Sequence, residues 1–228
     1  MFFSSVKEGI KLILSGNPEL YMIIWRTLFV SLSAVCIAGL IGIPLGISLG
    51  LRDFPGKSWV TRILYAFMGL PPVFVGLIVF ILLSRSSPIG RRIYLLFTPA
   101  AMIIAQVILA LPIITGLIMT AVEEKAEPII LTSKGLGADD LQIKLTLLAE
   151  LKISIIAGVV AALGRVIAEV GAVTLVGGDI EGYTRVLTTA IVLETRKGHF
   201  QLALALGLIL LFISFLINTA LYHWQHRR

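Results

Sequence analysis

The chain has 228 residues, of which 57% are hydrophobic and only 14% are charged, and its formal net charge is +6. Soluble domains are about half apolar and a quarter charged, so this composition excludes an ordinary soluble protein and indicates one that crosses a membrane several times. The positive charge does not indicate a nucleic-acid partner, because the sequence has no basic stripe with interleaved aromatic residues, and excess Lys and Arg in membrane proteins usually lies near lipid headgroups.

The N-terminal segment, residues 1–17, is expected to lie flat at the membrane surface. Its lysines interrupt the apolar core that a secretory signal peptide would need. Its apolar residues recur at helical spacing, at Phe3, Val6, Ile10 and Ile13. Asn17 suits the N-cap and Pro18 the first position of a helix, so the first long helix should begin there. The remainder, 18–228, would form a single membrane domain.

Five long stretches carry almost no charge. They are Thr27–Leu51, Ile63–Leu83, Leu95–Val122, Ile153–Gly178 and Phe200–Tyr222. Each is long enough to cross ~30 Å of hydrocarbon as a helix of ~20 residues, and the short alternating segments of transmembrane β-strands do not occur. The predicted fold class is therefore an all-α membrane protein with about five transmembrane helices. Cys36 is the only cysteine, so it cannot form an internal disulfide and is expected to be a small core residue.

Charge counting gives no orientation for these helices. An odd number of spans places the two termini on opposite faces of the membrane. The loops on the side of the C-terminus hold nine Lys and Arg residues, and the loops on the other side also hold nine. The positive-inside rule therefore expresses no preference.

Glycines and prolines mark places where the helices pack closely or bend. The first span repeats glycine at every fourth position, at Gly42, Gly46 and Gly50, which predicts a surface for close helix packing. Three prolines interrupt helical hydrogen bonding inside predicted spans: Pro71, Pro72 and Pro112. Each is a candidate hinge, with a fixed kink as the alternative.

The longest hydrophilic connection between spans is Glu123–Lys152, and its composition is neither Gly/Ser-rich nor disordered. Two short helical pieces should meet at Gly135 and Gly137, which supply a turn. After this turn, residues 138–148 can form a compact helix that projects from the membrane. An ordinary interhelical loop is the alternative.

Two charged residues, Arg165 and Glu169, stand within the fourth apolar stretch. A charge at the membrane centre costs about 2.5–3.5 kcal/mol, so ionisable residues there usually face a protein interior or a water-filled path. Steps of three and four residues place them on one helix face with small residues, namely Gly158, Ala161, Ala168 and Ala172. This face would line a translocation path near a dimer axis, with the pair as gate or latch. The alternative is a salt bridge that neutralises itself in a packed bundle.

Two further local patterns occur, at residues 184–198 and at residues 56–58. Thr184 can cap a short helix that runs to Lys197 and ends at Gly198, and we expect this helix to dip toward the bundle. Gly56-Lys57-Ser58 looks like the end of a phosphate-binding loop. Leu51 stands where such a loop requires its first glycine, so the chain is not expected to bind ATP.

Two other classes of function fit the sequence less well. A stand-alone secondary transporter or channel would need polar groups in the middle of several helices, or inverted repeats, and only one helix here is charged. An intramembrane protease would need catalytic groups paired at membrane depth, and neither a Ser/His nor a paired-Asp set occurs. The three histidines lack zinc-protease spacing, so no metal site is expected.

Several segments together resemble the permeases of ABC importers. In the coupling motif of that family a Glu-Ala-Ala element precedes a glycine; here Leu131-Thr-Ser133 and Gly137 stand in these places. The run Gly164–Ala172, which contains Arg165 and Glu169, and the Pro-Pro segment Gly69–Gly76 are similar to segments of permeases for molybdate, tungstate and sulfate. The segments that look most like the tungstate-uptake branch are Thr98–Gln106, Gly177–Arg185 and Leu187–Ala190.

This resemblance implies a type I ABC importer permease fold with a cytoplasmic coupling helix, whose contacts would come from Leu136, Gly137, Ala138, Asp139 and Leu141. The implied function is ATP-driven import of a tetrahedral oxyanion, most similar to tungstate uptake, with molybdate, sulfate or another oxyanion as alternatives. Because Glu169 would repel an oxyanion unless Arg165 screens it, we favour the mutual salt bridge over direct substrate contact.

The resemblance also implies the partners of the chain. It would form a homodimer in the lipid of the cell membrane, paired with an ABC ATP-binding subunit and an extracytoplasmic substrate-binding protein. ATP and Mg would be held by the ATP-binding subunit, so the chain itself would be neither an enzyme nor a cofactor carrier. Its N-terminus would lie outside and its C-terminus in the cytoplasm.

Overall fold

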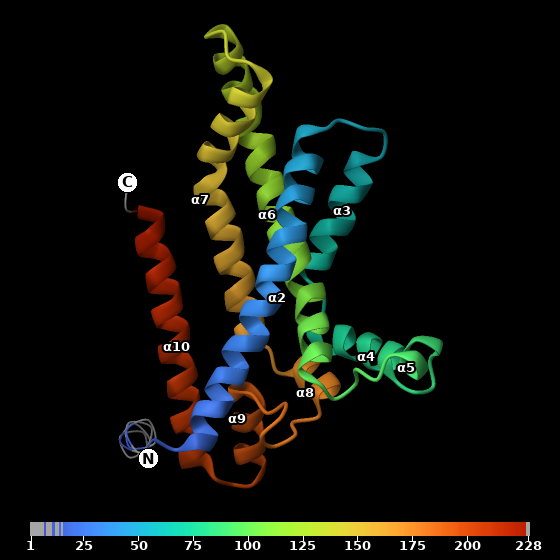
Figure 1. Ribbon diagram of the computed structural model, residues 1–228, viewed down its shortest axis with the longest axis vertical. Helices are drawn as coiled ribbons and strands as arrows, with labels where there is room; N and C mark the ends of the chain where they lie inside the picture. Colours follow the sequence, from blue (N-terminus) through green and yellow to red (C-terminus); the bar gives the residue numbers. More distant parts are fainter. Residues whose placement is uncertain (1–6, 8–10, 12–13, 15, 227–228) are drawn as a thin grey trace.

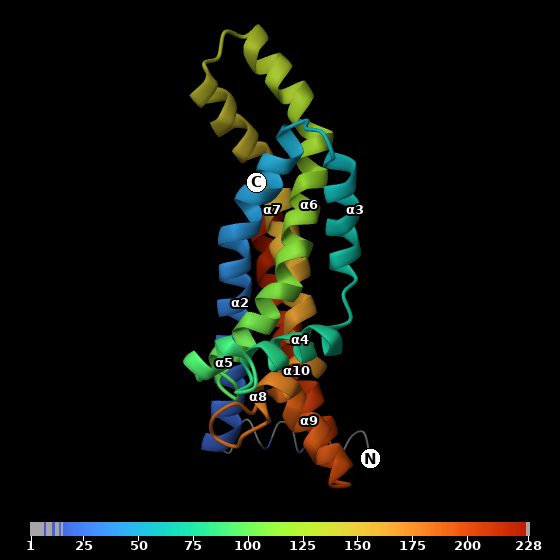
Figure 2. The ribbon, with the colours of Figure 1, turned by 90° about the vertical axis from the view of Figure 1, so that its right-hand side faces the viewer.

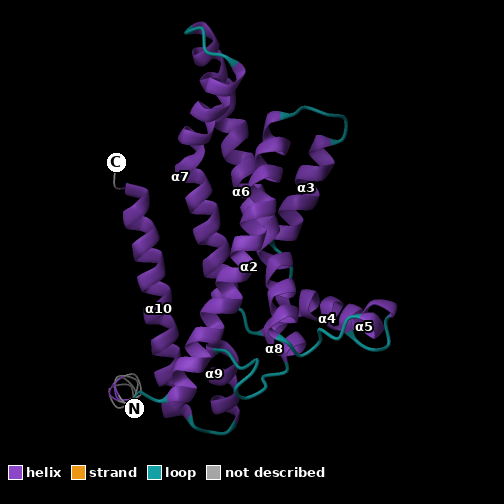
Figure 3. Ribbon diagram, in the orientation of Figure 1, coloured by secondary structure: helices purple, strands orange, loops and turns teal. Residues whose placement is uncertain are grey.

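The computed structural model describes residues 7, 11, 14 and 16–226, with side chains as far as residue 219. Most of the predicted surface segment 1–17 therefore lies outside the described residues. Between residues 16 and 226 all regular structure is helical and no strand occurs (Figure 3). Four helices are long and apolar enough to cross a membrane, and one bent pair can make a fifth span. The predicted all-α membrane fold with about five spans is confirmed.

Helices α2 (Pro18–Leu51) and α6 (Pro99–Gly135) run side by side through the centre of the bundle (Figures 1 and 2). The predicted glycine series of α2 lies against α6. A Cβ atom added at Gly46 would be only 2.7 Å from the carbonyl oxygen of Thr115. The two helix backbones can approach this closely only because the position carries no side chain, so the predicted packing surface is confirmed.

The ends of these two helices follow local chemistry. Asn17 caps α2 as predicted, because its side-chain oxygen accepts hydrogen bonds from the backbone amides of Glu19 and Leu20. Helix α6 begins at Pro99 behind the Thr98 cap and continues through Pro112 without a break. Because it ends only at Gly135, it extends well past Val122, the end of the predicted span Leu95–Val122. The expectation for Cys36 is wrong: it faces outward from α2.

The predicted second span is broken. Helix α3 (Lys57–Met68) and helix α4 (Pro72–Leu83) are bent by 97° across the short segment between them. Pro71 cannot continue a helix and restricts the residue before it, while Pro72 occupies the first helical position of α4. The prolines therefore start a new helix, and the predicted interruption at Pro71 and Pro72 is confirmed as a sharp break within the second span.

The predicted fourth span also differs from the structure. Helix α7 (Asp140–Ile167) begins inside the hydrophilic connection and ends at Ile167, after which the short helix α8 (Gly171–Gly177) starts. The expected continuous span to Gly178 is therefore wrong. The expected helix over 138–148 is present from Asp140 onward, as the first part of α7, and it passes directly into the membrane-spanning part.

The last elements are α5 (Pro88–Arg92), α9 (Leu187–Arg196) and α10 (Phe200–His226). The predicted cap at Thr184 is wrong. Its hydroxyl donates to the Gly177 carbonyl at 2.7 Å and accepts from the Ile180 amide, so it closes the loop before α9 instead. The predicted end at Gly198 is confirmed by its positive φ of 82° and by the hydrogen bonds around it.

The bundle has two distinct ends. The turn between α6 and α7 projects beyond all other elements at one end, and the far end of α10 points in the same general direction (Figure 1). The start of α2, the loop before α9 and helix α9 lie at the opposite end, while α4 and α5 extend sideways nearer to it (Figures 1 and 2). The main apolar core lies between α2, α6 and α7.

Candidate coupling hairpin and translocation site

The turn between α6 and α7 is built by local hydrogen bonds. Gly137 has a φ of 81°, a left-handed conformation that favours glycine. Its amide donates to the Lys134 carbonyl and the Ala138 amide donates to the Ser133 carbonyl, both at 3.0 Å. This arrangement is a Schellman motif, which closes a helix whose following residue is a left-handed glycine. Gly137, the glycine of the predicted coupling motif, thus closes the end of α6.

Asp139 is the N-cap of α7. Its carboxylate accepts hydrogen bonds from the amides of Leu141 and Gln142 at 2.9 and 2.8 Å, while the Gln142 side chain accepts from the Asp139 amide at 2.9 Å. This reciprocal capping box satisfies amides that would otherwise be unpaired at the helix start. The two helices therefore meet in a short, well-defined turn, which we call the hairpin, residues 131–145.

The hairpin exposes large apolar side chains although it lies at the end of the molecule. Leu136 is 84% exposed and Leu141 is 66% exposed, and neighbouring leucines on both helices are also exposed. The ends of α6 and α7 stand clear of the other helices there (Figure 1). Exposed apolar side chains gathered on a well-formed projection are typical of a protein contact surface.

At the other end of α7, the expected salt bridge is absent. Arg165 is exposed, and its guanidinium donates to the Leu70 carbonyl at 3.4 Å. None of the ion pairs found among the described residues includes Arg165 or Glu169. The expectation of a mutually neutralising pair fails because α7 ends at Ile167, so Glu169 does not continue the helical face that carries Arg165.

Glu169 acts instead as a cap. Its side chain is 7% exposed, and its Oε1 accepts a hydrogen bond from the Ala172 amide at 3.1 Å, at the start of α8. Its own carbonyl accepts from the Thr188 hydroxyl of α9 at 2.9 Å. The carboxylate therefore fixes the break between α7 and α8, and the backbone at the same residue holds α9 in place.

The predicted set of small residues is divided between two surfaces. Ala161 and Ala168 are exposed on the same side of α7 as Arg165. Gly158 faces α6, and Ala172 is fully buried under α4, where a Cβ atom at Gly76 would be 2.6 Å from the Ala172 Cα. The single face expected from the sequence is wrong because α7 ends before Ala172. What remains as the open surface of α7 is a strip formed by Ala161, Arg165 and Ala168.

The two broken spans meet at this strip. Helix α4 packs against α8, and Gly171 lies so close to Val73 that a Cβ atom there would be 2.6 Å from its Cγ2. The Leu70 carbonyl, which receives the Arg165 hydrogen bond, belongs to the break between α3 and α4. Interrupted helices at membrane depth occur where they are buried in protein or line a water-filled cavity.

The depth of Arg165 follows from helix contacts. Gly42 of α2 lies beside Thr115 of α6, and Gln106, nine residues earlier on α6, donates to the Val166 carbonyl at 3.1 Å. With a rise of ~1.5 Å per residue, and with both helices running in the same direction, Arg165 lies level with about residue 33 of α2. That position is inside the uncharged stretch Thr27–Leu51.

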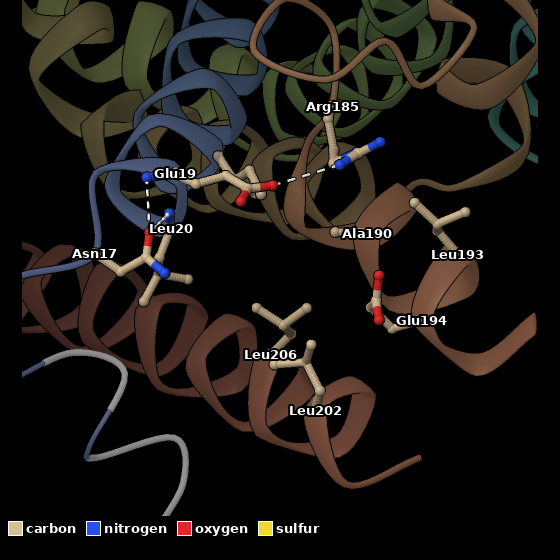
Figure 4. A pocket seen from close by; sticks show the side chains of 10 residues that line it. Asn17, Glu19, Leu20, Arg185, Ala190, Leu193, Glu194, Leu202 and Leu206 are labelled. Carbon is tan, nitrogen blue, oxygen red and sulfur yellow. Dashed lines mark hydrogen bonds and ion pairs between the residues drawn. The ribbon is translucent and has the colours of Figure 1, made fainter. Parts of the chain in front are cut away.

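A pocket of ≈ 120 Å³ lies at the opposite end from the hairpin, between α2, α9 and α10 (Figure 4). Its walls combine leucines with Glu19, Arg185 and Glu194. Arg185 already pairs with Glu19, Asp179 and Glu181. Because carboxylates outnumber the single arginine, this pocket does not suit an oxyanion.

Several residues that position Arg165 and the α7–α8 break could not be recognised as such from their residue types. Leu70, Gly76 and Thr188 act through a backbone carbonyl, the lack of a side chain and a hydroxyl, respectively. Only the Gly-Leu-Pro-Pro sequence around Leu70 carries a readable signal of a break.

Comparison with known proteins decides the family. The family described as binding-protein-dependent transport system inner membrane component matches residues 42–228. The chain belongs to this family. It is 43% identical, over 96% of both chains, to the tungstate uptake system permease protein of Peptoclostridium acidaminophilum. It is 38% identical to the protein of that name from Campylobacter jejuni, over 95% of this chain and 90% of the relative.

A more distant relative is the molybdenum transport system permease protein of Escherichia coli, which is 28% identical over 83% of this chain and 91% of its own. Family membership and the apolar helices make the protein a multi-pass permease of the inner membrane. The predicted resemblance to oxyanion permeases is confirmed.

Proposed function

We propose that this protein is the membrane subunit of an ATP-driven importer of tungstate. The similarity to the tungstate uptake permease of Peptoclostridium acidaminophilum carries the proposal, because the two chains are 43% identical over 96% of the length of each. Molybdate and sulfate are the alternative substrates, since permeases named for molybdenum and sulfate are more distant relatives. All three anions are tetrahedral and doubly charged.

The hairpin is the proposed contact with the ATP-binding subunit, with Leu136, Gly137, Ala138, Asp139 and Leu141 at its tip. The exposed leucines would fill an apolar groove of that subunit, and the Schellman turn and capping box would hold them rigidly. The chain itself would hold neither nucleotide nor metal. ATP and Mg would be bound, and ATP hydrolysed, by the partner.

A second copy of the chain would complete the translocation path. In a single chain the strip of Ala161, Arg165 and Ala168 is uncovered, and small side chains allow another helix to approach closely. A homodimer would place two such strips across a shared axis. An extracytoplasmic binding protein would deliver the anion at the end where α9 lies.

Movement at the hairpin would reach the path through continuous helices. Helix α6 has 37 residues and is therefore about 55 Å long, and α7 runs from the hairpin directly to the break beside Arg165. A displacement of the hairpin by the ATP-binding subunit would thus tilt both helices as stiff levers. The breaks near Pro71, Pro72 and Glu169 are the proposed flexible points, whereas Pro112 lies within an unbroken helix.

The proposed orientation places the hairpin and the C-terminal end in the cytoplasm and the N-terminus outside. Single cysteines at Lys134 on the hairpin and Glu181 in the loop before α9 test it, in a Cys36→Ala background. Both positions are exposed. In intact cells an impermeant thiol reagent should label Glu181→Cys and leave Lys134→Cys unlabelled. The reverse pattern would overturn the orientation and the hairpin assignment together.

The function is tested in vesicles that contain the permease, its ATP-binding subunit and its binding protein. With ATP available to the ATP-binding subunit, tungsten should accumulate inside, and a tenfold excess of sulfate should reduce this uptake far less than unlabelled tungstate does. Uptake of molybdate or sulfate in preference to tungstate would correct the substrate. Uptake that continues without the ATP-binding subunit would contradict the proposed class of transporter.

A further inference from the structure

The feature that carries a further inference is the charge of Arg165, which no carboxylate of the described residues neutralises within an ion pair. Glu169 is the nearest acidic residue in the sequence, but its carboxylate is buried and bonded to the Ala172 amide. A cation held inside the hydrophobic span without a counter-ion is costly and is typically retained for function. The described part of the chain therefore offers no carboxylate for this charge, and its partner is to be sought beyond that part.

We propose that Arg165 forms a transient binding site for the transported oxyanion at the break between α3 and α4. This inference rests on the proposed function and adds a specific ligand contact to it. One guanidinium N–H is directed to the Leu70 carbonyl at 3.4 Å, a long hydrogen bond that orients the group toward the α3–α4 break. A guanidinium has five N–H donors, so the others remain for an acceptor.

The chemistry of the site selects an oxyanion. The planar fork of a guanidinium donates two parallel hydrogen bonds to two oxygens of one anion, and such charge-assisted bonds are strong and directional. Ala161 and Ala168 flank Arg165 on the exposed strip, so no large side chain of that strip blocks an approaching ion. A lipid phosphate is a poorer candidate, because the site lies level with about residue 33 of α2, within the hydrophobic span.

With this contact the permease would itself bind the anion during transport, in addition to opening a path for it. The anion would leave the binding protein, meet one arginine at the constriction where the broken spans touch, and be released when the breaks change their angle. The Leu70 hydrogen bond joins the guanidinium to the α3–α4 break. Bending at that break would move the binding group away from the anion's first position, which couples release to the conformational change.

Charge restoration at position 165 tests the proposal. The protein is Arg165→Cys in a Cys36→Ala background, assembled with its ATP-binding subunit and binding protein in vesicles. The cysteine is then modified with methanethiosulfonate reagents that add an ammonium, a neutral methyl or a sulfonate group. The readouts are tungsten uptake and the ATP hydrolysis that loaded binding protein stimulates. The Cys36→Ala parent and Arg196→Gln, which removes an exposed arginine at the end of α9, receive the same treatments as controls.

We expect unmodified Arg165→Cys to lose at least about tenfold in uptake while stimulated ATP hydrolysis stays within about twofold of the parent. The ammonium reagent should restore uptake several-fold, and the neutral and sulfonate reagents should not. Equal restoration by the neutral reagent, or normal uptake without any reagent, would overturn the proposal. So would a joint loss of uptake and ATP hydrolysis that no reagent restores, because Arg165 would then serve only to hold Leu70.

A second pair of variants keeps the test decisive if the cysteine variant assembles poorly. Arg165→Lys keeps the charge, and Arg165→Gln keeps a donor for the Leu70 carbonyl. An anion site predicts several-fold more uptake with Lys than with Gln, whereas a purely structural contact predicts similar uptake for both. A parent that imports molybdate or sulfate instead of tungstate corrects the proposed substrate, and the dependence on charge is then read with that anion. A parent that imports no oxyanion overturns both proposals.

Discussion

A single hydrogen bond gives Glu169 a structural role that its position in the sequence does not indicate. From the sequence it is one helical turn from Arg165 and looks like its ion-pair partner. In the structure its carboxylate accepts from the Ala172 amide and starts α8. The difference arises because α7 ends at Ile167, two residues earlier, so the i, i+4 geometry of a helix does not apply.

The cap predicts unequal effects for two substitutions at this residue. Glu169→Gln keeps an oxygen that can accept from Ala172 and should unfold in detergent at close to the parent temperature. Glu169→Ala removes the acceptor and should cost about 1 kcal/mol, the typical value of a lost helix cap. If both variants were destabilised alike by about 3–5 kcal/mol, an ion pair and not a cap would be the role of Glu169.

Gly46 provides a second prediction at the same scale. A Cβ atom there would sit 2.7 Å from the Thr115 carbonyl oxygen, so Gly46→Ala should force the helices apart and cost about 1–3 kcal/mol. Gly207 on α10 is the matched control, since a Cβ there meets no heavy atom within 4 Å. Gly207→Ala should gain up to about 1 kcal/mol from helix propensity. Thermal unfolding of the purified protein measures both, and opposite signs are the expected result.

At the scale of helices, hydrogen bonds to the Glu194 carboxylate stabilise the turn between α9 and α10. The Glu194 carboxylate accepts a hydrogen bond from Lys197 at 2.8 Å and is joined to His199 at 2.7 Å. These two contacts, Lys197 first, lower the pKa of Glu194 below its ordinary value of 4.5. The contacts hold the end of α9 beside the start of α10, next to the pocket of Figure 4.

This pKa shift predicts a pH dependence of stability. Because the pKa of Glu194 is lower when folded than when unfolded, the ionised group stabilises the fold above pH 4.5, and the benefit is lost as the pH falls through the lowered value. The unfolding temperature of the parent should therefore drop more steeply below pH 4.5 than that of Glu194→Gln. Parallel curves for the two proteins would remove Glu194 from this role.

The elements also show what sequence patterns can and cannot predict. Apolar stretches located the four long spanning helices and the bent pair α3–α4, and Asn17 and Gly198 marked helix ends correctly, because these signals are local. The interruption at Pro71 and Pro72 was predicted, although not its angle of 97°, whereas the break after Ile167 was missed. Hydropathy does not change at a break, and the α7–α8 break depends on distant contacts with α4 and α9. The Arg165–Leu70 contact joins residues far apart in the chain and leaves no local pattern.

At the scale of the whole molecule, the two proposed tasks lie at separate places joined by α7. The hairpin, with Leu136 and Leu141 exposed, would receive movement from the ATP-binding subunit. The strip around Arg165, where the broken spans meet, would pass the anion. A defect at either place should therefore stop transport in a different way.

The most direct test of this division between the hairpin and the Arg165 strip is to measure ATP hydrolysis stimulated by loaded binding protein together with tungsten uptake in the same vesicles. The double variant Leu136→Ser/Leu141→Ser should fold and insert normally, because both side chains are exposed in the single chain, with Arg196→Gln as control. We predict that it loses stimulated hydrolysis and uptake together, at least about tenfold each, whereas Arg165→Gln loses uptake alone. Unchanged hydrolysis and uptake in the double variant would contradict the hairpin as the point where ATP-driven movement enters the permease.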